Sequence, residues 1–187
     1  MAMKSASNQL SGWVEEFTHE LLSWALHKVS DTETAKDLVQ DTFLAAAEKI
    51  NDFRGESSPK TWLFSILNYK IIDHYRKKVK QPVSLDDDSF LSFFSAEGDW
   101  KKEKKPRDWH EEESHLLDNP EFMEVLSKCL KELPEKWNAS VRLKYLLNKT
   151  GEEICQELDM TPTNLWQIIH RAKVKLRDCV ENKWFEN

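Results

Sequence analysis

Two clusters of cationic side chains, each interleaved with aromatic or amide side chains, are the parts of this sequence that could do chemistry. One lies in residues 60–80 and the other in residues 161–177. Lysine and arginine neutralise phosphates, aromatic rings stack on bases, and side-chain amides hydrogen-bond to base edges. The sequence therefore predicts nucleic-acid binding at two separate places.

The charge distribution agrees with this prediction, although a net charge of −6 argues against a nucleic-acid partner if the charge is spread evenly. Residues 1–80 and 121–187 each hold 11 acidic and 11 basic side chains, so residues 81–120 carry the whole acidic excess. Local patches steer a protein to phosphate more strongly than net charge does. Each end of the chain is thus free to present a basic patch.

Helical periodicity runs through the first 80 residues. Apolar residues recur at i, i+3, i+4 and i+7 over residues 10–28, 35–53 and 60–78, and alternation of period two is absent, so we expect an all-α fold. Ser30 or Asp31 caps the second helix, and Ser58 followed by Pro59 begins the third. The second helix turns an acidic face outward. The expected core residues are Phe17, Leu21, Leu38, Phe43 and Ile66.

Two strings in this part of the chain carry a family resemblance. Asp-Leu-Val-Gln-Asp-Thr-Phe at 37–43 and Phe-Arg-Gly-Glu-Ser-Ser-Pro-Lys-Thr-Trp-Leu at 53–63 closely resemble region 2 of bacterial extracytoplasmic-function sigma factors, which direct RNA polymerase to promoters. The resemblance implies that the first string docks on core polymerase, through Asp37, Gln40, Asp41 and Phe43. It implies that the loop and the next helix open and read the minus-10 element, with a flipped base held by the loop and Asn68. The implied minus-10 residues are Arg54, Gly55, Glu56, Ser57, Lys60, Trp62, Asn68, Lys70, His74, Arg76, Lys77 and Lys78.

A helix-turn-helix is predicted near the C-terminus from the residues themselves. This motif needs a small residue where the helices cross, a turn residue that tolerates positive φ four places later, and an aliphatic plug six places after that. Cys155, Asp159 and Leu165 occupy those positions. Thr161 then caps the recognition helix and Pro162 occupies its first turn.

The same stretch resembles region 4 of the sigma family, which reads the minus-35 element. The implied minus-35 residues are Thr161, Thr163, Asn164, Trp166, Gln167, His170, Arg171 and Lys173. Two departures from the family pattern stand out: Asp159 replaces the common glycine, and Trp166 and Ile168 stand where many members carry basic residues. Aspartate tolerates the left-handed turn, so the fold is expected to survive the first departure.

The chain is therefore expected to consist of region 2 at residues 8–80, an acidic linker at 81–119 and region 4 at 120–185. A flexible coil of 40 residues spans about 35 Å on average and about 130 Å when stretched, enough for about 25 base pairs of about 3.4 Å each. In the family the linker threads the RNA path of the polymerase. A purely solubilising tether is the alternative, and the aromatic residues of the segment count against it.

Catalysis, cofactors and metal ions are not expected. No glycine-rich phosphate loop or Gly-x-Ser-x-Gly elbow occurs. Cys155, His170 and Cys179 could be imagined as a zinc cluster, yet Cys155 is already assigned to the helix crossing. The three cysteines lack Cys-x-x-Cys spacing, which predicts reduced thiols in a cytoplasmic protein. No apolar run is long enough to insert in a membrane, and no signal-peptide pattern is present.

The resulting hypothesis is a sigma factor whose partners are core RNA polymerase, promoter DNA and, by family resemblance alone, an anti-sigma factor. Two alternatives stay open at this point. One is a helix-turn-helix regulator that binds an operator without polymerase. The other is an adaptor that binds only proteins and has no salt-dependent affinity for DNA.

Overall fold

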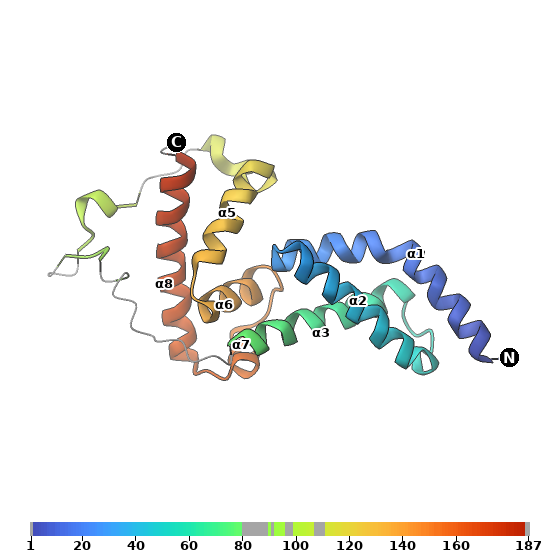
Figure 1. Cartoon of the computed structure of the whole chain (residues 1–187). Helices are drawn as coiled ribbons and strands as arrows, with labels where there is room; N and C mark the ends of the chain where they lie inside the picture. The colour runs from blue at the N-terminus through green and yellow to red at the C-terminus, as the bar shows by residue number, and fades with distance from the viewer. Residues whose placement is uncertain (1, 80–89, 91, 96–98, 107–110, 186–187) are drawn as a thin grey trace. The chain divides into compact units, whose positions relative to one another are not determined.

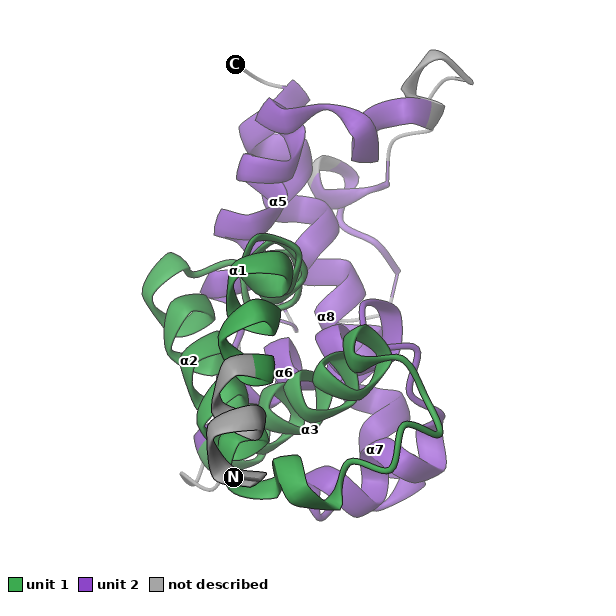
Figure 2. Ribbon diagram, turned by 90° about the vertical axis from the view of Figure 1, so that its right-hand side faces the viewer, with its two compact units in different colours: residues 1–77 green, residues 78–187 purple. Residues whose placement is uncertain are grey.

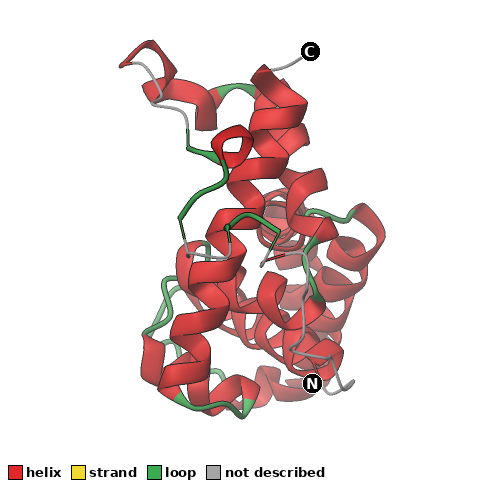
Figure 3. Cartoon of the chain, turned by 90° about the vertical axis from the view of Figure 1, so that its left-hand side faces the viewer, coloured by secondary structure: helices red, strands yellow, loops and turns green. Residues whose placement is uncertain are grey.

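Helices make up the secondary structure of the residues that the structure describes. The computed structural model describes residues 2–79, 90, 92–95, 99–106 and 111–185, and the chain divides into unit 1, residues 1–77, and unit 2, residues 78–187 (Figure 2). Within the described residues, β structure is limited to one bridge between Phe94 and Trp100. Figure 3 shows helices and loops and no strand among these residues. The predicted all-α class is confirmed.

In the described part of the chain, unit 1 is built from three helices and one short turn of 3₁₀ helix (Figure 1). They are α1 (Ala2–Val29), α2 (Thr32–Lys49), η1 (Ile50–Asp52) and α3 (Pro59–Val79). The three predicted helices are confirmed in type and order. Helix α1 begins earlier than predicted, because it continues beyond the apolar stripe that periodicity detects. Helix α2 is followed directly by the 3₁₀ turn η1.

The starts of α2 and α3 follow the capping chemistry read from the sequence. The Asp31 carboxylate accepts a hydrogen bond from the Thr34 backbone N–H at 2.9 Å, and the Ser58 hydroxyl accepts one from the Thr61 N–H at 3.1 Å. Each cap satisfies a backbone donor that has no partner within the first turn of its helix. Ser30, the other candidate cap, instead adopts a positive φ of 53° at the junction between α1 and α2.

The core of unit 1 confirms three of the five predicted core residues. Phe17, Leu21 and Leu38 are buried. Phe43 and Ile66 are only half-buried, so their prediction was wrong. Phe43 lies at the edge of the buried stripe of α2, next to the buried Thr42. Ile66 lies at the edge of the buried stripe of α3, next to the buried Leu67. The buried stripes consist of Ala35, Leu38, Val39, Thr42 and Ala46 in α2, and of Leu63, Leu67, Ile71, Ile72 and Tyr75 in α3.

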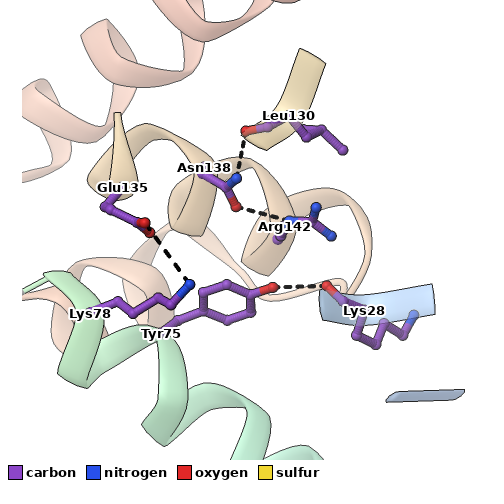
Figure 4. Close-up of polar contacts among 7 residues, drawn as sticks. All are labelled: Lys28, Tyr75, Lys78, Leu130, Glu135, Asn138 and Arg142. Atoms are coloured by element: carbon purple, nitrogen blue, oxygen red, sulfur yellow. Dashed lines mark hydrogen bonds and ion pairs between the residues drawn. The ribbon is translucent and has the colours of Figure 1, made fainter. Parts of the chain in front are cut away.

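Two long-range hydrogen bonds fix α3 against α1. The buried Tyr75 hydroxyl donates to the Lys28 carbonyl at 2.8 Å (Figure 4). The Trp24 indole N–H donates to the Asn68 side-chain oxygen at 2.9 Å. Because a buried hydroxyl is costly when unpaired, the Tyr75 bond specifies how α3 lies along α1, and the exposed Trp24–Asn68 bond adds a second point of contact.

Unit 2 is organised around its longest helix (Figure 1). The short helix η3 (Glu111–Asp118) precedes α5 (Pro120–Glu132), α6 (Glu135–Tyr145), α7 (Gly151–Leu158) and α8 (Pro162–Val180), and η4 (Glu181–Phe185) follows. Helices α5, α6 and α7 all contact α8. A short 3₁₀ turn, η2 (Lys102–Lys104), belongs to the same unit.

A buried polar chain links α5 to α6 inside unit 2. The Asn138 amide donates to the Leu130 carbonyl, and the Arg142 Nε donates to the Asn138 side-chain oxygen at 2.8 Å (Figure 4). Arg142 is only 1% exposed. A buried guanidinium is tolerated only when its donors are used, so this chain restricts how α6 packs.

The cysteines depart from the sequence-based expectation. Cys129 of α5 and Cys179 of α8 are joined in a disulfide, with their Cα atoms 5.8 Å apart. Cys155 is the remaining free thiol. The prediction of three reduced thiols was therefore wrong for two of them, because a pairing between residues 50 apart depends on the packing of α5 against α8 and leaves no local spacing signal.

Among the described residues, none of the helices combines the length with the apolar content that crossing a bilayer requires.

A reciprocal capping box starts α7. The Thr150 hydroxyl accepts from the Glu153 N–H at 3.2 Å, and the Glu153 carboxylate accepts from the Thr150 N–H at 2.8 Å. Lys149 forms an ion pair with the same carboxylate at 2.7 Å. The hydrogen bond from Lys149 and then that from the Thr150 backbone lower the pKa of Glu153 from 4.5 to about 2.

This capping box predicts a pH dependence of unit 2. Since the pKa of Glu153 is lower in the folded chain, its stabilisation is fully present above pH 4.5 and is lost as the pH falls toward about 2. We expect Glu153→Gln to remove the part of the acid destabilisation that lies in this window, measured by urea unfolding at several pH values.

The matched control is Glu152→Gln, which removes a neighbouring carboxylate from the same helical turn. An NMR titration of the Glu153 carboxyl carbon in the native chain gives a direct check. A midpoint near 4.5 would contradict the capping box.

Candidate nucleic-acid interface

The outer face of α2 is acidic and exposed, as predicted. Asp37, Gln40 and Asp41 are exposed, whereas Phe43 is half-buried and contributes only part of its ring. Leu44, which is 59% exposed, was not among the predicted contact residues. Positions 37, 41, 44 and 48 follow one another along a single helix face, so an apolar residue in an otherwise acidic stripe is the signal that could have found it. This surface suits a basic protein partner with an apolar contact at its centre.

The loop between η1 and α3 encloses a hollow of about 300 Å³. Gly55 has a φ of +71°, a conformation that side chains with a Cβ rarely adopt, and it turns the loop back toward α3. Four residues that the sequence analysis assigned to this region line the hollow, namely Arg54, Glu56, Ser57 and Trp62, and Asp52 and Phe53 complete it.

An aromatic cluster forms the wall of this hollow. Trp62 lies 5.0 Å from Phe53 and 6.0 Å from Trp13, measured between ring centroids. Trp13 is buried, which holds the other two rings in place. A rigid aromatic wall beside hydrogen-bonding side chains is the kind of surface on which an unstacked base rests.

Three basic residues of α3 have carboxylate partners on α3 itself or on α1. Asp73 pairs with Lys77 at 2.8 Å and with Arg76 at 3.8 Å, and Lys60 pairs with Glu20 of α1. The hydrogen bond from Lys77 is the largest of the effects that lower the pKa of Asp73, and the same bond raises the pKa of Lys77. A phosphate that binds these cations must therefore compete with a carboxylate.

The other predicted minus-10 residues lie along α3 in different environments. Lys78 is exposed, whereas Lys70 and His74 are half-buried, and the His74 ring lies edge-on to Tyr75 at 5.4 Å. Asn68 is half-buried and accepts the hydrogen bond from Trp24 described above. Its carbonyl oxygen is thus already used in fixing α3, and its amide N–H₂ group is the part with which it would contact a base.

The helix-turn-helix has the predicted geometry. Asp159 adopts a left-handed conformation with a φ of 47°, and the Thr161 hydroxyl accepts from the Asn164 N–H at 3.3 Å. Leu165 and Ile154 are buried between the two helices, and Cys155 is half-buried at the crossing. The turn, the cap and the plug read from the sequence are all confirmed.

One face of α8 is exposed from its first turn to Lys173. The exposed residues of this face are Thr163, Trp166, Gln167, His170 and Lys173. Asn164 and Arg171 are half-buried, and Thr161 is exposed at the N-cap. The Trp166 and His170 rings stack with centroids 5.7 Å apart and planes 4° from parallel. Ile168 is 1% exposed and belongs to the core, which leaves Trp166 as the unusual residue of this surface.

Part of the predicted linker lies against α8. Residues 81–89 lie outside the described residues, but Phe93 is buried, and Phe94 and Trp100 pack 4.7 Å apart. We call Phe90, Phe93, Phe94 and Trp100 the aromatic turn. Phe90 lies 5.3 Å from the Arg171 guanidinium and 6.1 Å from the His170 ring.

An ion pair also ties this segment to α8. Lys104 pairs with Asp178 at 2.7 Å, and the same ammonium lies 5.6 Å from the Phe93 ring. These contacts with the predicted recognition helix were not anticipated from the sequence. The high density of aromatic residues in an acidic segment was the available signal.

Comparisons with known proteins match both units. The sigma-70 region 2 family matches residues 13–81, and the sigma-70 region 4 family matches residues 123–176. A probable RNA polymerase sigma factor of Haemophilus influenzae is 34% identical over 173 residues, which cover 91% of this chain and 89% of that relative. The ECF RNA polymerase sigma factor SigM of Bacillus subtilis is 26% identical over 161 residues, which cover 86% of this chain and 88% of the relative.

A solved structure with a similar chain is the sigma factor RpoE of Bartonella quintana, co-crystallised with the anti-sigma factor NepR. The match covers 94% of this chain and 98% of that chain at 21% sequence identity, with a TM-score of 0.44.

The ion pairs of Asp73 predict the effect of removing its charge. We expect Asp73→Asn to strengthen binding of a single-stranded oligonucleotide, because Arg76 and Lys77 lose the carboxylate that competes with phosphate. In fluorescence anisotropy titrations at several salt concentrations, the slope of log K against log salt should steepen by about 0.7 for each additional phosphate that the variant neutralises.

Asp37→Asn is the matched control, since it removes the same charge from the outer face of α2. An equal increase in affinity in both variants would mean that net charge, and not the release of Arg76 and Lys77, governs the binding.

Proposed function

This chain belongs to the sigma-70 family of RNA polymerase sigma factors, in its extracytoplasmic-function group, and from that premise we propose that unit 1 binds the polymerase and opens the minus-10 element while unit 2 reads the minus-35 element. As a sigma factor, the chain binds core RNA polymerase and directs promoter-specific initiation of transcription. The family is one of non-catalytic transcription factors. The observation that carries this function is the presence of both regions, in family order, in one chain.

The proposed polymerase contact is the acidic face of α2. Asp37, Gln40 and Asp41 would supply the polar contacts, and Phe43 and Leu44 would supply apolar area. The buried side of the same helix packs on α1, so the contact can be made without disturbing the core of unit 1. Exposure of a large apolar residue inside a polar stripe is typical of an interface.

The proposed minus-10 site is the hollow beside Trp62. Extruding a base from the duplex costs a few kcal/mol, and stacking on an aromatic wall returns about 1 to 3 kcal/mol per base. Arg54, Gly55, Glu56 and Ser57 surround the extruded base. Lys60, Lys70, His74, Arg76, Lys77 and Lys78 hold the adjoining phosphates, and the Asn68 amide contributes from α3.

The proposed minus-35 site is the exposed face of α8. Asn164 and Gln167 are one turn apart, and their amides are suited to base edges in the major groove. Thr161, Thr163, Arg171 and Lys173 serve phosphates or adjacent bases. The stacked pair of Trp166 and His170 offers an apolar surface, which fits a thymine methyl group better than a phosphate.

The remaining assignments follow the family. The proposed boundaries are region 2 at 8–80, the linker at 81–119 and region 4 at 120–185, and the proposed place of action is the cytoplasm, where core polymerase and promoter DNA are found. An anti-sigma factor is proposed as a further partner on the strength of the family resemblance.

The experiment that tests the function is run-off transcription with purified chain, sigma-free core polymerase and genomic DNA fragments. We expect discrete start sites that require the chain. A helix-turn-helix regulator that acts without polymerase, or an adaptor without DNA affinity, would give none.

The minus-35 assignment predicts selective losses. We expect Asn164→Ala or Gln167→Ala to lower transcription from promoters that carry one particular base at the contacted position. The expected loss of binding free energy on those promoters is about 1 to 3 kcal/mol. Run-off yields from a set of promoters with single base changes measure the effect. Asn182→Ala, an exposed amide on η4, is the control, and a uniform loss on every template would count against base reading.

The polymerase contact predicts the effect of a charge reversal. We expect Asp41→Lys to weaken binding to core polymerase about tenfold or more, equivalent to about 1.4 kcal/mol, while leaving the circular dichroism spectrum unchanged. Glu15→Lys, at an exposed position of α1, controls for the change in net charge. Unchanged retention of Asp41→Lys on immobilised core would refute the assignment.

A further inference from the structure

The cysteine pair of unit 2 joins helix α5 to helix α8. Cys129 lies near the end of α5 and Cys179 near the end of α8, and their Cα separation of 5.8 Å is normal for a disulfide. No backbone movement is therefore required for the bond to exist, and the thiols would lie side by side without it. The third cysteine, Cys155, belongs to the crossing of α7 and α8 and has no part in the pair.

The two sulfurs differ in their access to solvent. Cys129 is 1% exposed and packs in an apolar cluster with Phe122 and Val180, which Trp184 and Phe185 extend. Cys179 is half-buried at the margin of that cluster. A small reagent therefore reaches Cys179 first, and Cys129 is reached only through its partner.

The expected surroundings of a sigma factor make this pair unusual. Thiols are kept reduced in the cytoplasm, and disulfides in cytoplasmic proteins of ordinary organisms are mostly transient or redox-sensing. This step rests on the proposed cytoplasmic function. A bond between one buried and one half-buried cysteine in such a protein is better explained by reversible chemistry than by a permanent disulfide.

We propose that Cys129 and Cys179 form a reversible redox site, which hydroperoxides oxidise to the disulfide and cellular dithiols reduce. The Cys179 thiolate attacks the peroxide oxygen, which gives a sulfenic acid and releases water after protonation. The Cys129 thiol then attacks the Cys179 sulfur, and the second oxygen leaves as water. Two thiols and one hydrogen peroxide thus yield one disulfide and two waters.

The site acts on the DNA-reading unit through chain connectivity. The bond closes a loop between residues 50 apart, and this loop contains α6, α7 and most of α8. Closing such a loop removes conformations from the unfolded chain and so favours the folded unit. Oxidation therefore keeps the helix-turn-helix folded at temperatures where the reduced unit begins to unfold.

The test uses the full chain with Cys155→Ser, so that only the pair can react. The protein is equilibrated in glutathione buffers from mostly reduced to mostly oxidised, with hydrogen peroxide as a separate oxidant, and free thiols are counted by alkylation and mass spectrometry. We expect two thiols at the reduced end, none at the oxidised end, and a monomer throughout.

Three results would overturn the proposal. A bond that survives in mostly reduced glutathione would be a permanent structural disulfide. Thiols that remain alkylatable after peroxide treatment would show that the pair does not bond. Dimers on a non-reducing gel would show that the cysteines pair between chains.

The effect on the fold is measured on the same samples. We expect the oxidised chain to melt more than about 10 °C above the reduced chain, and we expect this difference to vanish in Cys179→Ser. Equal melting temperatures of the two redox forms would contradict the proposed effect. These readouts need no polymerase, so failure of run-off transcription would count against the proposed function and leave the redox result standing.

Discussion

Burial of one side of α8 is the constraint on which unit 2 depends. Leu165, Ile168, Ile169, Ala172, Val174 and Val180 form its buried stripe, and α5, α6 and α7 pack around it. Each large apolar side chain that is fully buried contributes about 1.5 to 3 kcal/mol. Since one helix supplies both the core stripe and the exposed face, apolar packing on one side of α8 sets the position of the exposed side chains on the other.

In unit 1, the position of the charged face of α3 is also fixed from the opposite side of the helix. Helix α3 buries Leu63, Leu67 and Ile71 and leaves its charged side chains outside. The hydrogen bonds of Tyr75 and of Asn68 with α1 fix the position of this charged face. Trp62 of α3 lines the hollow together with residues of the preceding loop, so the hollow adjoins the charged face of the same helix.

Local signals in the sequence predicted the helices and most of the candidate surfaces. Caps at Asp31, Ser58 and Thr161, the left-handed turn at Asp159 and the exposed acidic face of α2 all depend on neighbours within one or two helical turns, and the structure confirms them. Phe43 and Ile66 were misplaced because periodicity identifies a stripe but does not fix its edges.

The features that could not be predicted from the sequence depend on pairs of residues far apart in the chain. Lys60 forms an ion pair with Glu20, Trp24 donates a hydrogen bond to Asn68, and Cys129 forms a disulfide with Cys179. No spacing rule links such partners, because helix packing alone brings them together. The fold was therefore predictable, whereas the long-range partners that change the charge and chemistry of the candidate surfaces were not.

The aromatic turn has a consequence for access to the Arg171 guanidinium on α8. Phe90 lies over the Arg171 guanidinium, so a phosphate approaching that group meets an occupant that belongs to the same molecule. A competitor on the same chain acts at a fixed effective concentration, which dilution of the protein does not lower. The apparent affinity of Arg171 for a phosphate is its intrinsic affinity multiplied by the fraction of molecules in which Phe90 is displaced. Any partner that draws the aromatic turn away from α8 would therefore make the Arg171 guanidinium more accessible to an anionic ligand.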